Sequence, residues 1–74
     1  MKQDIRLKTV LIIKKDGEYL VAKCPVTGRL IWRDSKWEAW KTRTRAKARS
    51  VVEKTGGEIY LFNPVAGQIR KYMG

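Results

Sequence analysis

The stretch that decides the expected fold runs from Asp34 to Gly57 and reads Asp-Ser-Lys-Trp-Glu-Ala-Trp-Lys-Thr-Arg-Thr-Arg-Ala-Lys-Ala-Arg-Ser-Val-Val-Glu-Lys-Thr-Gly-Gly. Ser35 followed three residues later by Glu38 forms a capping box, so we expect a helix to begin just after Ser35. The closing Gly-Gly pair supplies the left-handed residue that commonly ends a helix. The stretch therefore predicts one helix over about residues 36–55.

The predicted helix has two chemically different sides. At about 100° per residue, its apolar and small residues share one side, which is typical of a helix that packs on a sheet. These residues are Trp37, Trp40, Thr44, Ala48, Val51 and Val52. Another side carries basic residues with no acid beside them: Lys36, Arg43, Lys47 and Lys54. Basic residues at every second position from Lys41 to Arg49 would also fit a strand, but the alanine content and the two caps favour a helix.

A hairpin is predicted before the helix. Apolar and basic residues alternate from about Ile5 to Lys14, which indicates a strand, and Asp16-Gly17 is a strong signal for a type I′ turn. Folding the chain there pairs Lys15 with Glu18, Ile13 with Leu20, Leu11 with Ala22 and Thr9 with Cys24. The expected core face then comprises Leu7, Leu11, Ile13, Leu20, Ala22 and Cys24. The opposite face holds an apolar patch of Val10, Ile12, Tyr19 and Val21, so either a second element covers it or it contacts a partner such as a second copy.

Two similar turns frame the rest of the chain. The pattern Cys24-Pro-Val-Thr-Gly28 recurs almost position for position as Asn63-Pro-Val-Ala-Gly67. Both segments combine a proline that presets φ with a glycine that can be left-handed. We expect strands over about 29–33, 59–62 and 68–72. The order β-β-β-α-β-β predicts a single α+β domain over residues 1–74, with its helix on one face of a small antiparallel sheet. A slip of one residue would move Trp32 to the other face, so its facing stays open.

Composition limits the function. The net charge is +10 with a pI near 10.2, which attracts polyanions, nucleic acid being the commonest. Histidine is absent and Cys24 is the only cysteine, which excludes an internal disulfide, a His/Cys zinc site and an imidazole-dependent triad. No catalytic constellation is visible, and we expect a protein without enzymatic activity, metal or cofactor. No apolar run approaches a membrane span and the first residues lack a signal-peptide core, so we expect a cytoplasmic protein without membrane contact.

The tryptophans have two interpretations. Exposed indoles beside arginines could stack on unpaired bases. Alternatively, they anchor a small core where helix meets sheet. The positions of Trp37 and Trp40 on the apolar side of the helix favour the core interpretation for those two.

The layout of three strands followed by one long helix resembles two related groups of DNA-binding domain. The matching segment is roughly 17–64: Gly-Glu-Tyr-Leu-Val-Ala-Lys, a Pro/Gly turn, Arg-Leu-Ile-Trp-Arg, then the helix. The groups are the domain of plant ethylene-response transcription factors and the arm-site domain of phage and transposon integrases. The resemblance implies that the sheet enters the major groove with the helix behind it. It nominates Lys23, Arg29 and Arg33 as contacts to DNA.

The sequence thus predicts a small nucleic-acid-binding domain, DNA ahead of RNA, of bacterial or mobile-element type. Phosphate contacts are expected from the helix side chains Lys36, Arg43, Lys47 and Lys54, with the sheet residues Lys23, Arg29 and Arg33 as the alternative. The rival hypothesis is a protein-interaction or inhibitor module that docks an acidic partner surface or self-associates.

Overall fold

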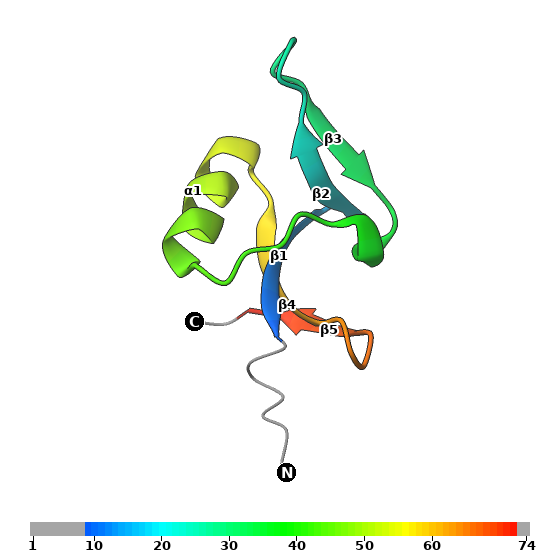
Figure 1. Cartoon of the computed structure of the whole chain (residues 1–74). Coiled ribbons are helices and arrows are strands. Elements are labelled where there is room, and N and C mark those ends of the chain that lie inside the picture. Colours follow the sequence, from blue (N-terminus) through cyan, green and yellow to red (C-terminus); the bar gives the residue numbers. More distant parts are fainter. Residues whose placement is uncertain (1–8, 73–74) are drawn as a thin grey trace.

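The computed structural model describes residues 9–72 and shows one five-stranded antiparallel sheet with a single α-helix (Figure 1). The strands lie in the order β3-β2-β1-β4-β5. The elements are β1 (Val10–Lys15), β2 (Glu18–Lys23), β3 (Leu30–Arg33), the 3-10 helix η2 (Lys36–Glu38), α1 (Arg45–Thr55), β4 (Glu58–Asn63) and β5 (Gln68–Lys71). The α+β prediction and the order of elements are confirmed. Leu7 and the strand start near Ile5 lie outside the described residues.

The central strand β1 is bounded by two antiparallel partners. The turn to β2 has positive φ at both Asp16 (50°) and Gly17 (81°), as a type I′ turn requires. Lys15 pairs with Glu18, which confirms the predicted register of this hairpin at its turn. On its other edge β1 pairs with β4 along its length, from Val10 opposite Phe62 to Lys14 opposite Glu58. The C-terminal part of the chain therefore completes the sheet begun by the first hairpin.

The predicted pairing of β1 with β2 does not continue beyond the turn. Leu11 bonds to Thr42 instead of Ala22, through N–H···O bonds of 2.7 and 3.0 Å in the two directions. Ala22 pairs with Ile31 of β3 and is exposed, so its predicted place in the core is wrong. The register of β2 against β3 also shifts between Leu20 and Ala22, and such a bulge bends a strand and increases its twist. As a result, β2 leaves β1 soon after the turn.

The helix begins at Arg45, nine positions later than the capping box predicts. Ser35 and Glu38 start only the 3-10 turn η2, and the Ser35 side chain makes no capping bond. The residues after η2 are extended because their backbone bonds to the sheet: Trp40 N–H donates to the Leu20 carbonyl at 2.8 Å, and Thr42 bonds to Leu11. The predicted end is confirmed at Thr55, where Gly56 adopts the left-handed conformation.

The sheet buries apolar side chains on both faces. On the α1 side, Leu11, Ile13, Leu20 and Ala48 form one core cluster, which Val51, Val52 and Trp32 border. This arrangement places Trp32 on the α1 side of the sheet, opposite Leu20 of β2. On the other side, Ile12, Tyr19, Ala39 and Phe62 form a second cluster. The side chains of β1 therefore alternate between two small cores, and Ile12 and Ile13 are both fully buried.

Candidate nucleic-acid interface

Several basic side chains are held by contacts within the fold. The Lys15 ammonium donates to the Thr55 carbonyl at 3.1 Å, where it satisfies the end of α1. Lys41 donates to the carbonyls of Trp37 and Ala39, and Lys71 pairs with Glu58 at 2.8 Å. Other cations lie over aromatic rings: Lys14 over Tyr19 and Tyr60, Lys36 over Trp37, and Arg45 over Tyr72. These charges help to hold the structure together.

A second set of basic side chains has no such role. Within residues 9–72, the side chains of Lys23, Lys47 and Lys54 take part in no hydrogen bond, ion pair or cation–π contact, and all three are exposed. Arg29, Arg33 and Arg43 are exposed as well. Six of the seven residues nominated from the sequence thus keep their charge available to a partner. Lys36 is the exception, because its ammonium lies 5.8 Å from the centroid of the Trp37 ring and it is half-buried.

The predicted acid-free stripe on the helix is divided in the structure. Lys36 and Arg43 precede α1, so they cannot share its surface. Lys47 and Lys54 remain, seven residues apart and therefore on the same side of α1. Arg29 and Arg33 belong to the β2–β3 hairpin, which bends up beside α1 (Figure 1). Of the sheet residues that the sequence offered as the alternative, Lys23 lies opposite Leu30 on the α1 side of the sheet, whereas Arg33 lies opposite Tyr19 and therefore on the other face.

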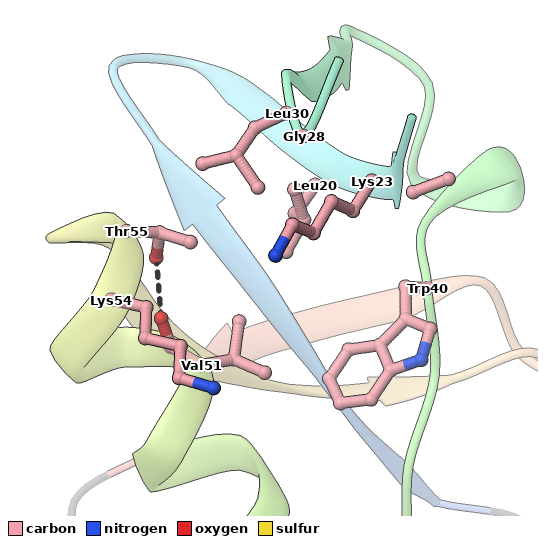
Figure 2. Close-up of a pocket in the computed structure, with 9 residues that line it drawn as sticks. Leu20, Lys23, Gly28, Leu30, Trp40, Val51, Lys54 and Thr55 are labelled. Atoms are coloured by element: carbon pink, nitrogen blue, oxygen red, sulfur yellow. Dashed lines mark hydrogen bonds between the residues drawn. The ribbon is translucent and has the colours of Figure 1, made fainter. Parts of the chain in front are cut away.

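Lys23 of β2 and Lys54 of α1 line a common hollow of about 420 Å³ (Figure 2). Its apolar lining comes from three elements: Leu20 and Leu30 from the sheet, Val51 from α1, and Trp40 from the segment after η2. Figure 2 shows α1 on one side, the indole of Trp40 on the other, and the β2–β3 hairpin above. None of the residues lining the hollow is acidic. An occupant that is apolar on one side and anionic on the other would match both parts of this lining.

The three tryptophans lie in different environments. Trp40 and Trp32 are half-buried and pack against the core cluster on the α1 side. Trp37 lies against the other face of the sheet, where its ring meets Phe62 edge to face at 5.3 Å. It is 56% exposed. The prediction that Trp37 and Trp40 share one side of a helix is therefore wrong, because the helix does not include them.

The apolar patch considered for self-association is largely covered. Ile12 is 0% and Tyr19 is 7% exposed, since Ala39 and Phe62 pack against them. Of the four patch residues, Val10 and Val21 are half-buried and keep some surface. Other residues of the chain thus cover most of this face. This was the first of the two alternatives predicted from the sequence, the other being contact with a partner.

Other features of the described residues offer less chemistry. Between residues 9 and 72, no three Asp, Glu or Cys side chains gather as a metal-ligand set. Hydrogen bonds from the Thr27 hydroxyl and from the backbone of Thr27 and Val26 lower the pKa of the Cys24 thiol. No helix in this part of the chain is long and apolar enough to span a bilayer.

Comparisons of the chain with protein-family models, curated proteins and solved structures found no match. They leave the resemblance to the two DNA-binding groups an expectation. That resemblance places the helix behind the first three strands, whereas α1 packs mainly on β1 and β4. The function must therefore be inferred from the residues of this chain.

Sequence reasoning missed the hollow, although it nominated both of its lysines. The sequence offers Lys23 and Lys54 as alternatives because one lies on the predicted sheet and the other on the predicted helix. The alternation of Lys41, Thr42, Arg43 and Thr44 was the available signal for the extended segment. It was outweighed by the capping box, which in the structure starts only one turn.

Proposed function

We propose that this chain is a small, non-enzymatic nucleic-acid-binding domain that contacts phosphates through the side of the molecule shared by α1 and the β2–β3 hairpin. The observation that carries the proposal is the hollow lined by Lys23 and Lys54 without an acid. Lys47 extends the same charge along α1, and Arg29 directly follows Gly28, which also lines the hollow. Arg33 lies opposite Tyr19 on the other face of the hairpin. Ammonium and guanidinium groups that are free of internal partners can replace counterions on a phosphate backbone.

DNA is the proposed partner ahead of RNA, and the cytoplasm is the proposed compartment. The preference for DNA comes from the sequence resemblance alone, as does the proposed bacterial or mobile-element origin. Phosphate contacts position a protein without reading bases. We therefore expect affinity for generic duplex that varies little with sequence.

The test is the affinity for a generic DNA duplex at about 50 and 200 mM salt. We expect affinity to fall steeply with salt. Replacing Lys23 and Lys54 together by glutamine should weaken binding and reduce the slope of log K against log salt by about 2, or about 1 for each phosphate contact. The matched control for each single replacement, Lys23→Gln or Lys54→Gln, is Lys71→Gln, which removes one charge from a side chain already paired with Glu58. No binding at the lower salt concentration would refute the proposal.

The rival proposal is an interaction module for an acidic protein surface. The exposed apolar residues favour it: Val26 is 89%, Val65 is 70% and Trp37 is 56% exposed. Such a module would give salt-dependent binding to acidic proteins but no affinity for duplex. Light scattering of the isolated chain tests the self-associating form, for which a stable dimer is expected.

A further inference from the structure

Three hollows on the described part of the chain could hold a ligand, and their linings differ. One, of about 350 Å³, includes Glu58 and Lys71, whose charges already pair. Another, of about 510 Å³, is mainly polar and includes Arg70 at the β4–β5 end of the sheet. Among these three, the hollow between α1 and the β2–β3 hairpin is the one that combines an apolar lining with two cations that lack internal partners. It therefore has the most specific chemistry of the three.

This hollow is a product of how the sheet divides. Trp40 donates its backbone N–H to Leu20, and Thr42 takes the place of β2 beside Leu11. The extended segment after η2 thus follows β1 where β2 bends away to pair with β3. A space therefore opens between the diverging strands and α1. The side chain of Trp40 lies at its edge and does not fill it. Because backbone hydrogen bonds fix its walls, the hollow is preformed.

The charge of the lining restricts what can enter. Lys23 and Lys54 both line the hollow and no acid does, so the lining attracts an anion and disfavours a cation. The Trp40 indole, Leu30 and Val51 favour a flat apolar group beside that anion. A nucleotide unit has both parts, a base and a phosphate. A base within a duplex is stacked on both faces and paired along one edge, which leaves only an unpaired base free to enter.

We propose that this hollow accommodates one unpaired nucleotide, with the base against the Trp40 indole and a flanking phosphate between Lys23 and Lys54. The inference rests on the proposed nucleic-acid function and adds a structural preference to it. Stacking on aromatic side chains tolerates any base. The domain would thus prefer distorted or partly single-stranded sites over perfect duplex, without reading their sequence.

The experiment compares three duplexes that are identical except at one position: fully paired, with one unpaired thymidine, and with an unpaired abasic residue. The natural chain should bind the thymidine bulge at least about fivefold more tightly than the paired duplex. The abasic bulge should lose most of that gain, because it keeps the distortion but lacks the base. The difference in affinity between the thymidine bulge and the abasic bulge therefore separates recognition of the base from recognition of the bend.

The matched variants are Val51→Phe and Val52→Phe. Both replace a half-buried valine of α1 by a larger apolar side chain and leave the charge unchanged, but only Val51 lines the hollow. We expect Val51→Phe to bring the affinities for the thymidine bulge and the paired duplex within about twofold of each other. Val52→Phe should keep the preference of the natural chain.

A second readout reports on Trp40 directly. The three tryptophans give three indole N–H signals in a nitrogen–proton correlation spectrum, and Trp37→Phe and Trp40→Phe assign two of them. The Trp40 signal should shift on adding the thymidine bulge to Val52→Phe but not to Val51→Phe. Equal affinity for all three duplexes would overturn the inference and leave the proposed function standing, as would a bulge preference that survives Val51→Phe. No binding to any duplex at low salt would overturn both.

Discussion

The two proline-valine turns have nearly the same sequence and backbone but are held by different atoms. In the turn from Asn63, the Gly67 N–H donates to the Asn63 carbonyl at 2.7 Å, and in the turn from Cys24 the Gly28 N–H donates to the Cys24 carbonyl at 2.8 Å. Both glycines have positive φ, 72° and 76°. The repeat noticed in the sequence is therefore a true structural repeat, at the tips of the β2–β3 and β4–β5 hairpins.

The first residue of each turn is influenced by the same two later positions. Asn63 Oδ1 accepts the N–H groups of Val65 and Ala66 at 3.0 and 3.3 Å. At the equivalent place, the Thr27 hydroxyl and the backbone of Thr27 and Val26 lower the pKa of the Cys24 thiol. An amide oxygen is a strong acceptor and a thiol a weak one, but the thiol can ionise. The same turn geometry therefore has a purely structural role in one hairpin and lowers the pKa of a thiol in the other.

The largest difference between the turns should appear at their glycines. An L-residue with left-handed backbone costs about 1–2 kcal/mol, so both Gly28→Ala and Gly67→Ala should lower the free energy of unfolding. A Cβ at Gly67 would also lie 3.3 and 3.4 Å from atoms of the Trp37 ring, whereas at Gly28 the nearest atom is the flexible Lys23 Cε at 3.8 Å. We expect Gly67→Ala to cost more, measured by urea denaturation.

Trp37→Ala supplies the control for this prediction. Combined with Gly67→Ala in a double-mutant cycle, it should reduce the cost of the alanine to that seen at Gly28. If Gly28→Ala and Gly67→Ala lowered the free energy of unfolding equally in the natural chain, the Trp37 ring would move aside at no cost. The two turns would then be equivalent.

The capping side chains give a smaller difference. Asn63→Ala removes the acceptor for two backbone N–H groups and should lower the free energy of unfolding by about 0.5–1.5 kcal/mol. Cys24→Ala should cost less, because a thiol is a weak acceptor at neutral pH. Thermal or urea unfolding of the two variants, each compared with the natural chain, measures both. A larger loss from Cys24→Ala would reverse our ranking of the two acceptors.

The smallest effect is on proton binding. Because the pKa of Cys24 is lowered in the folded chain, ionisation favours the folded state. This contribution is fully present above the ordinary thiol pKa and is lost as the pH falls through the folded value. The difference in unfolding free energy between the natural chain and Cys24→Ala should therefore grow from about pH 7 to about pH 9.5.

Removing the main cause of the shift tests the same point chemically. Thr27→Val deletes the hydroxyl that acts most strongly on Cys24, so the pKa of the thiol should rise. The pH at which alkylation by iodoacetamide reaches half its maximal rate should move upward. An unchanged profile would mean that the backbone groups alone set the pKa.

The sequence predicted the elements that depend on neighbouring residues. The Asp16-Gly17 turn, the end of α1 at Gly56 and the two proline turns all formed as expected, because each is specified by the φ preferences of one or two residues. The capping box misled because it too is a local signal, and its competitor is not local. The hydrogen bonds of Thr42 to Leu11, and of Trp40 to Leu20, join parts of the chain that only the folded sheet brings together.

The sequence predicted individual residues of the candidate site but not their arrangement in space. Lys23 and Lys54 were both nominated for their charge, yet nothing in the sequence indicated that they line one hollow with Trp40 between α1 and the hairpin. That arrangement depends on where β2 bends, which the bulge after Leu20 decides. Bulges have no strong sequence signal here, since Val21 is an ordinary strand residue.

The position of β1 also has a consequence for how the chain folds. The central strand is synthesised early, yet its partner β4 comes after α1. Contacts so far apart in sequence must close a long loop before they stabilise anything, and folding slows as such contacts increase. A nascent chain that still lacks β4 leaves one edge of β1 unpaired beside Ile12 and Ile13. We therefore expect folding to follow synthesis of nearly the whole domain and to proceed in a single cooperative step.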